Sequence, residues 1–353
     1  MTRLFLPCML AFVMLLVGSI GGAIMIGNTF KSEMIAFVRV SPVNSPEANT
    51  DIYLKDFSRN LTINLTKTPG IWEMSPVWSP NGDYLAYALL PTNTDNGGIY
   101  IIAMNEIAMN EGRQRRIDVQ TRPRGLIRWS PDGLCLVFQE RIMGGVPSGG
   151  LSLVSLDGHQ QVSWNDEDGI VTHLQWFPDG QHLLFTVQYE SFHVMDIQTQ
   201  NVRTISIEGS QPDLSPDGQL IAFAYYDDED SGIRIRSLED NTQYTLVNEF
   251  ESAHSPMWSP DGNRIAFINR STAGWNDIYV IDADGTDLHR LTHNNGFDSF
   301  ILSWSPDSRR IIFAYNGMTP IFAIDIHDDS FSLPYELTHP GATEADSSPA
   351  WRP

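Results

Sequence analysis

The sequence is poor in cysteine and in positive charge. Its 353 residues include only two cysteines, Cys8 in an apolar N-terminal stretch and Cys135 in an expected core strand, so no disulfide framework can be drawn. Its 22 basic residues are outnumbered by 43 acidic ones, which gives a net charge of -21. Such a charge repels phosphate backbones and anionic lipid headgroups. Nucleic acid is therefore excluded as an expected partner, while basic, cationic and metal-bearing partners remain open.

The common catalytic motifs are also missing. The sequence contains no Gly-x-Ser-x-Gly elbow, the turn with which an α/β-hydrolase exposes its serine nucleophile. It contains neither the His-Glu-x-x-His pattern nor the Cys-x-x-Cys pattern of common zinc sites. The sequence therefore predicts no catalytic residue, no cofactor and no bound metal.

An uncharged apolar segment extends from Leu4 to Ile26. Its length permits a helix that crosses a bilayer. A cleaved signal peptide is the alternative, with Phe5–Val17 as its apolar core and Gly21–Ala23 as the small residues before the cleavage site. We therefore expect residues 1–30 to be a signal anchor or a signal peptide. The rest of the chain is expected to be extracytoplasmic, in the periplasm or at the cell surface, and either membrane-anchored or secreted.

One motif recurs along the rest of the chain. It reads Trp-Ser-Pro-Asp-Gly or a close variant, its prolines lie 38 to 51 residues apart, and its copies begin at Trp78, Trp129, Trp176, Leu214, Trp258 and Trp304. Proline, aspartate and glycine suit successive positions of a tight turn. A nearly continuous apolar strand follows each turn, as expected for a strand that is buried on both faces. A period in the forties with several short strands per unit is typical of β-propeller blades.

The two ends of the repeat region each contain part of a unit. Ser348–Pro353 matches Ser255–Pro260, whereas Met34–Val38 resembles a second strand that lacks its first. We expect the C-terminal strand to complete the blade that the N-terminal residues begin, because this closure removes exposed sheet edges. Residues 34–353 are therefore predicted to form an all-β, seven-bladed β-propeller. It would be closed by pairing of the N- and C-terminal strands and preceded by one N-terminal hydrophobic helix.

These repeats resemble the WD-like propeller repeats of the TolB family. The resemblance extends over Met34–Pro353 and is strongest from Asp277 to Thr292. Its departures from the family pattern include Asn81 for aspartate and Ser308 for glycine. The resemblance implies a propeller fold and a habit of binding proteins, but it does not imply one function.

In a propeller, the loops that enter the first strands converge on one mouth of the central channel, and loops on a rigid scaffold are where binding usually resides. The ligand-binding residues expected at this mouth are Glu73, Met74, Arg122, Arg124, His173, Gln211, His254, Asp298, Phe300 and Asp346. Two arginines beside carboxylates make a mixed-sign patch that is suited to oriented recognition. We therefore hypothesise that Arg122 and Arg124 anchor an acidic group of the ligand.

The predicted function is a non-catalytic one. The chain is expected to be a binding or scaffold propeller that recognises an envelope or extracellular protein, or a glycan. The membrane is a further partner if the N-terminal helix is not cleaved. The competing hypothesis is a polysaccharide lyase or hydrolase with a metal site at the channel mouth, where His173 and His254 would be the candidate ligands.

Overall fold

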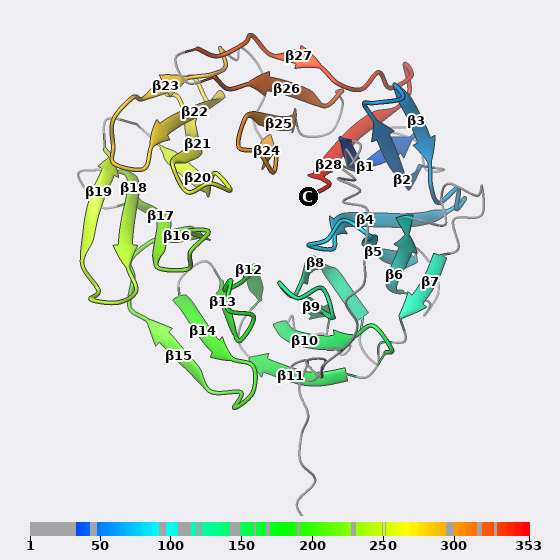
Figure 1. The fold of residues 1–353 in the computed structure, drawn as a ribbon, viewed down its shortest axis with the longest axis horizontal. Helices are drawn as coiled ribbons and strands as arrows, with labels where there is room; N and C mark the ends of the chain where they lie inside the picture. Colours follow the sequence, from blue (N-terminus) through cyan, green and yellow to red (C-terminus); the bar gives the residue numbers. More distant parts are fainter. Residues whose placement is uncertain are drawn as a thin grey trace, which may run out of the picture.

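The computed structural model is an all-β ring of sheets around a central axis (Figure 1). It describes residues 33–353 apart from 43–47, 92–96, 105–113, 118, 120–121, 142–148, 159, 167–169, 189–190, 227–230, 249, 251, 294–299, 316–319 and 328–329. The expected N-terminal hydrophobic helix lies outside the described residues. Within those ranges, no helix has the length and apolar character needed to cross a membrane.

Five sheets are separate and contain four antiparallel strands each. The first consists of β8 (Arg122–Trp129), β9 (Cys135–Arg141), β10 (Gly149–Ser155) and β11 (Gln160–Asp166). The second and third consist of β12 (Val171–Trp176), β13 (His182–Val187), β14 (Ser191–Asp196) and β15 (Val202–Ile205), then β16 (Ser210–Leu214), β17 (Leu220–Tyr226), β18 (Ser231–Ser237) and β19 (Gln243–Val247). The last two consist of β20 (Ala253–Trp258), β21 (Arg264–Arg270), β22 (Asn276–Asp282) and β23 (His289–Arg290), then β24 (Phe300–Trp304), β25 (Arg310–Tyr315), β26 (Phe322–Asp325) and β27 (Tyr335–Glu336).

The remaining strands form one eight-stranded sheet. It contains β28 (Ala345–Trp351), β1 (Met34–Ser41), β2 (Asn49–Asp56) and β3 (Leu61–Asn64), then β4 (Ile71–Trp78), β5 (Tyr84–Pro91), β6 (Gly98–Ala103) and β7 (Gln114–Ile117). Its two antiparallel halves are joined by a single parallel pair, Thr50 with Trp72. The prediction of seven separate blades is therefore wrong in that form, because only five sheets are separate. The halves are fused because the Thr50 hydroxyl hydrogen-bonds both the N–H and the carbonyl oxygen of Glu73, at 2.5 and 2.7 Å.

The expected closure is confirmed. Strand β28 pairs antiparallel with β1, with Ile35 opposite Trp351 and Ala36 opposite Ala350. The backbone N–H of Arg352 extends this ladder by donating to the carbonyl oxygen of Met34 at 2.9 Å. Because β28 lies between β1 and the ring axis, the C-terminal strand takes the innermost place of the sheet that β1 begins (Figure 1).

The core lies between neighbouring sheets. One cluster joins Ile278 and Val280 of β22 to Leu302 and Trp304 of β24, and comparable clusters fill the spaces between the other sheets. Second strands such as β21 are buried on both faces, as their apolar sequences predict. Tight packing of this kind makes the ring a rigid support for the strands nearest the axis.

Candidate functional site

The strands nearest the axis are β4, β8, β12, β16, β20, β24 and β28, which we call the inner strands (Figure 1). The predicted binding residues were expected in the loops before these strands. Instead, the structure places nine of the ten on the inner strands themselves, and Asp298 lies outside the described residues. The strands begin earlier than the motif suggested, because backbone pairing such as Arg122 with Arg141 and Phe300 with Tyr315 extends the sheets toward the mouth.

Glu73 is enclosed in the protein and is not an exposed mouth carboxylate. Only 1% of its surface is exposed. Its carboxylate accepts hydrogen bonds from the hydroxyls of Thr66 and Thr68 and, at 3.0 Å, from the backbone N–H of Ile52. Burial outweighs these hydrogen bonds and raises the pKa of Glu73 to about 7. Glu73 therefore stabilises the junction between β2 and β4, and Met74 beside it packs against a core cluster.

Asp346 also forms its contacts inside a sheet. It is fully buried, and its two carboxylate oxygens accept hydrogen bonds from Nε and Nη2 of Arg39 at 2.6 and 2.9 Å. The same guanidinium lies over the ring of Tyr53, 4.6 Å from its centroid. A bidentate pair of this kind aligns β28 with β1. The expected patch of Glu73 and Asp346 facing arginines across the mouth is therefore corrected, because both carboxylates are engaged within the sheet.

Backbone irregularities set the direction of the other side chains on the inner strands. Gln211 and Ser255 both have a φ of 52°, in the left-handed region, and the register shifts beside each of them. A bulge of this kind re-aims the following side chains. At the bulges, the side-chain oxygen of Gln211 accepts a hydrogen bond from the backbone N–H of Ser255 at 2.9 Å. Neighbouring inner strands are thus linked to each other by side chains near the axis.

A polar group that the sequence reasoning missed lies next on these strands. Arg128, Gln175 and Asp213 occupy the same position on β8, β12 and β16, directly before the first residue of the motif. With His173 they form what we call the axial cluster. All four side chains are partly exposed, and burial is the largest cause of the shifted pKa values of Arg128, His173 and Asp213. The sequence contains one signal for this cluster. Arg128, Gln175 and Asp213 are polar, whereas the equivalent residues Val77, Met257 and Ala350 are apolar.

Backbone groups hold the axial cluster in place. Oε1 of Gln175 accepts a hydrogen bond from the N–H of Leu214 at 2.9 Å, and Oδ2 of Asp213 accepts one from the N–H of Trp258 at 2.7 Å. Burial raises the pKa of Asp213 to about 7, against the opposing effects of its hydrogen bonds and of Arg128. Burial and the charge of Arg128 lower the pKa of His173 to about 4, so its imidazole is neutral at neutral pH.

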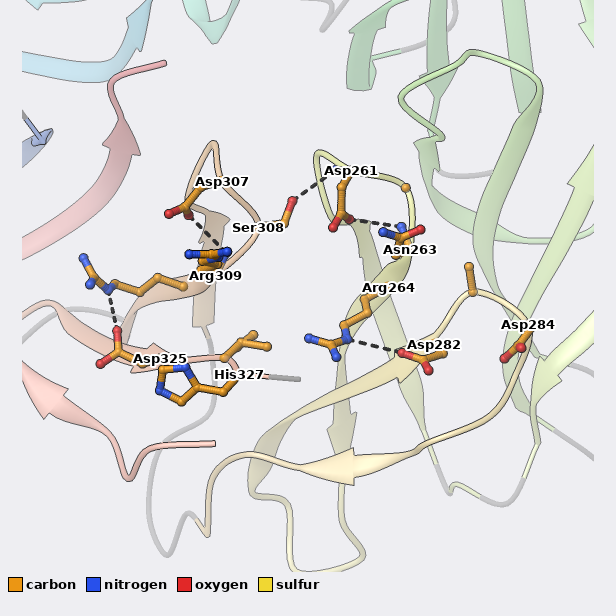
Figure 2. A pocket seen from close by; sticks show the side chains of 14 residues that line it. Asp261, Asn263, Arg264, Asp282, Asp284, Asp307, Ser308, Arg309, Asp325 and His327 are labelled. Carbon is orange, nitrogen blue, oxygen red and sulfur yellow. Dashed lines mark hydrogen bonds and ion pairs between the residues drawn. The ribbon is translucent and has the colours of Figure 1, made fainter. Parts of the chain in front are cut away.

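A cleft of about 1120 Å³ opens between the sheet of β20–β23 and the sheet of β24–β27 (Figure 2). It lies at the hairpins that follow the inner strands, and hence at the opposite end of these strands from the predicted mouth. Its lining is strongly polar and comprises Asp261, Gly262, Asn263, Arg264, Asp282, Ala283, Asp284, Asp307, Ser308, Arg309, Arg310, Asp325, Ile326 and His327.

The repeated motif builds the walls of this cleft. In one wall, the hydroxyl of Ser259 donates to Asp261 at 2.6 Å and accepts from the N–H of Arg264 at 2.9 Å, which closes the turn. Ser308 stands where other repeats have glycine and has a φ of 59°. Its hydroxyl accepts a hydrogen bond from the N–H of Asp261 at 3.0 Å (Figure 2). The departure from glycine therefore ties two neighbouring hairpins together.

Ion pairs neutralise much of the charge in the cleft. Arg264 pairs with Asp282 on one wall at 3.2 Å, and Arg310 pairs with Asp325 on the other at 2.6 Å (Figure 2). Arg309, next to Arg310 in the sequence, adds an exposed side chain to the lining of the cleft. The cleft thus offers both signs of charge, which suits a polar or zwitterionic surface of a partner.

The candidate metal ligands His173 and His254 lie on different inner strands. Nδ1 of His254 is 3.0 Å from the hydroxyl of Ser255, and burial lowers the pKa of His254 as it does that of His173. In the portion of the chain that the structure describes, no three His, Cys, Asp or Glu side chains are grouped so that they could hold a metal ion. The metal-dependent hypothesis therefore gains no support from the described residues.

Comparison with known proteins relates part of this chain to a known domain family. Residues 188–351 match the TolB beta propeller domain. A TolB homologue of Chlorobium luteolum is 30% identical over 131 residues, which make up 36% of this chain and 28% of the relative. The matched region of this chain therefore spans less than a third of that relative.

Solved structures share the fold. TolB of Acinetobacter baumannii is 17% identical, with a TM-score of 0.53 over 91% of this chain and 67% of that chain. An oligogalacturonate lyase in complex with manganese is 16% identical, with a TM-score of 0.63 over 79% of this chain and 84% of that chain. At these identities the likeness concerns the fold alone. Over residues 188–351 this chain therefore carries TolB-like β-propeller repeats, and the closed ring shows the propeller fold that such repeats build.

Proposed function

We propose that this chain is an extracytoplasmic binding propeller that recognises an envelope protein at the mouth where its inner strands begin. In this proposal, residues 1–30 are the signal anchor or signal peptide and residues 34–353 are the propeller. The two halves of the eight-stranded sheet act as two blades, so that the ring has seven. The protein needs no cofactor for this role.

The observation that carries the proposal is the arrangement of the inner strands. They bring residues that are far apart in the sequence to one rigid ring, from Met74 on β4 to Phe300 on β24. The resemblance to a family with a habit of binding proteins supports it. Among the expected site residues, Arg122 and Arg124 on β8 are the ones that we assign to anchoring an acidic group of the partner.

Affinity capture from an envelope extract tests the proposal. The bait is the full-length chain, and the matched bait carries Arg122→Ala and Arg124→Ala together. We expect mass spectrometry to find an envelope protein that the first bait retains and the second loses. Equal retention by both baits, or no retained protein, would contradict the proposal, and retention of a polysaccharide alone would replace the protein partner by a glycan.

The role of the leader has a separate test. Cells that produce the full-length chain are fractionated, and the N-terminal sequence of the recovered protein is determined. An uncleaved chain in the membrane fraction supports the anchor, whereas a processed soluble chain supports the signal peptide. Recovery of an intact chain from the cytoplasm would contradict the extracytoplasmic location.

A further inference from the structure

Arg128 is a partly buried cation with most of its hydrogen-bonding capacity unused. Its Nη1 donates to the carbonyl oxygen of Ile127 at 2.9 Å. A guanidinium has five N–H donors, and no second hydrogen bond or ion pair of Arg128 is found among the residues that the structure describes. Burial lowers the pKa of this group, which means that its surroundings do not fully compensate its charge. None of its nitrogens is among the buried polar atoms that lack a partner in the described residues, so its unused N–H groups reach solvent and are open to a ligand.

Asp213 does not provide that pairing. One of its carboxylate oxygens is held by the backbone N–H of Trp258 at 2.7 Å, and its other interaction is a hydrogen bond with Gln175. Arg128 acts on Asp213 only through its field, as the weakest of the influences on that carboxyl group. Arg128 and Asp213 are therefore near enough to influence each other electrostatically but form no direct ion pair in the described part of the chain.

His173 is an independent sign that the axial cluster is built for a ligand. Its Nε2 is buried and has no hydrogen-bond partner within the described part of the chain. Leaving a buried polar atom unpaired costs about 1–3 kcal/mol. A hydrogen bond with Gln175 opposes the effect of burial, but the pKa of His173 still falls to about 4, so the ring is neutral at neutral pH. With its single proton on Nε2, the ring can donate one hydrogen bond without adding charge.

We propose that the axial cluster binds a carboxylate group, with Arg128 as its bidentate partner and His173 as a second donor. The planar fork of a guanidinium matches the two oxygens of a carboxylate. A phosphate dianion fits less well, because one arginine supplies a single positive charge and Asp213 is a competing acid. Asp213 and Gln175 are placed to hydrogen-bond the polar groups that flank the carboxylate, such as the hydroxyls of a uronic acid or the amides of an acidic peptide.

This inference does not depend on the proposed role of Arg122 and Arg124. It concerns a different site, on β8, β12 and β16, and it requires that the ligand carry a carboxylate group. The ligand must reach the axis with an anionic group, although the protein carries a net charge of -21. Selectivity for a carboxylate therefore has to come from Arg128.

The test is a ligand-observed NMR titration of the full-length chain with pairs of probes that differ in charge only. D-galacturonate is compared with D-galactose, and N-acetyl-aspartate with N-acetyl-asparagine. We expect the carboxylates to bind and the neutral partners to bind at least about tenfold more weakly, the factor for one charged hydrogen bond. The tighter of the two carboxylates identifies the source as a uronic acid or an acidic peptide.

Two variants and one control tie the binding to the cluster. Arg128→Lys keeps the charge but loses the fork, so binding of the carboxylate should weaken at least about tenfold. Asp213→Asn removes the competing acid and should tighten binding, which provides a gain of function that misfolding cannot mimic. Arg115→Gln, at an exposed position on the outer strand β7, is the control and should leave binding unchanged. Equal binding of charged and neutral probes, or carboxylate binding that survives Arg128→Lys, would overturn the proposal.

Discussion

The indole Nε1 of Trp78 donates a hydrogen bond of 3.1 Å to the carbonyl oxygen of Ala350, 272 residues away in the sequence. Trp129 makes the equivalent bond to Val77 and Trp304 makes it to Met257, at 3.1 and 3.2 Å. At Trp78, Trp129 and Trp304, the tryptophan of the repeated motif therefore links an inner strand to the one before it. At Trp78 this link joins the two ends of the ring.

The Trp78 link should be measurable by a matched pair of substitutions. Trp78→Phe removes the indole N–H together with part of the ring, whereas Trp258→Phe removes an indole N–H that has no partner within the described residues. We expect Trp78→Phe to lower the free energy of unfolding by about 1 kcal/mol more than Trp258→Phe does. Denaturant unfolding of both variants checks this. Equal losses would show that the bond to Ala350 adds no stability.

Removal of the closing strand should have a much larger effect. Deletion of Ser348–Pro353 takes away Trp351, which is 7% exposed, and the hydrogen bond from Nε of Arg352 to the carbonyl oxygen of Gly82. Loss of one buried tryptophan alone costs about 3–5 kcal/mol. We therefore expect a large drop in melting temperature, whereas Leu333→Ser, at a site that is 86% exposed, should leave it unchanged. A truncated chain that melts within a degree or two of the full chain would contradict closure by β28.

The buried pair of Arg39 and Asp346 should respond in opposite ways to single and double substitution. Asp346→Ala leaves the guanidinium without its bidentate partner and should lower the free energy of unfolding by about 3–5 kcal/mol. Arg39→Met combined with Asp346→Leu removes both charges and should recover most of that loss. Glu336→Ala, which breaks an exposed pair with His339, is the control and should change stability by less than about 1 kcal/mol. A double variant as unstable as Asp346→Ala would contradict this account.

Glu73 should make stability fall as the pH rises. Its pKa is raised from 4.5 to about 7 by burial, so the folded protein holds a proton that the unfolded chain has already released between these values. This stabilising contribution is complete below about pH 4.5 and is lost as the pH rises through about 7. Its size is on the order of 3 kcal/mol.

Glu73→Gln tests this dependence, because it removes the titration and keeps the shape of the side chain. Unfolding measured from acid to neutral pH should show a smaller decline in stability for the variant than for the original chain. Asp213 contributes in the same direction and His173 in the opposite one, so the comparison between the two proteins is the informative quantity. Glu208→Gln, at an exposed carboxylate, should leave the slope unchanged. A slope that Glu73→Gln does not alter would show that the carboxyl group is ionised in the fold.

The sequence predicted the fold better than it predicted the site. The six copies of the motif and their period predicted the propeller, and the partial units Ser348–Pro353 and Met34–Val38 predicted its closure. The fusion of the first two units could not be predicted, because it depends on hydrogen bonds between the hydroxyl of Thr50 and the backbone of Glu73. No local pattern encodes such a contact.

The site was harder to predict because strand ends and bulges decide where a side chain points. Glu73 and Asp346 are charged residues of the kind expected at the mouth. Because they lie within β4 and β28, both are instead buried and hydrogen-bonded inside the sheet. Arg128 and Asp213 lie within strands where the neighbouring apolar residues favour a core position. These two polar residues were therefore not predicted as site residues. Arg122 and Arg124 lie on β8, and their proposed role in anchoring the partner is tested by substitution.

Arg122→Ala and Arg124→Ala together should weaken binding of the captured partner while the melting curve stays unchanged. Anchoring residues at an interface typically contribute more than about 1 kcal/mol each, so the double variant should lose at least about tenfold in affinity. Arg115→Ala with Arg116→Ala is the matched control, because it removes the same charge from exposed positions on the outer strand β7. Isothermal titration calorimetry with the captured partner gives both affinities. A loss below about 0.5 kcal/mol would place Arg122 and Arg124 among neutral surface residues. A loss on Arg309→Ala instead would move the site to the cleft between β20–β23 and β24–β27.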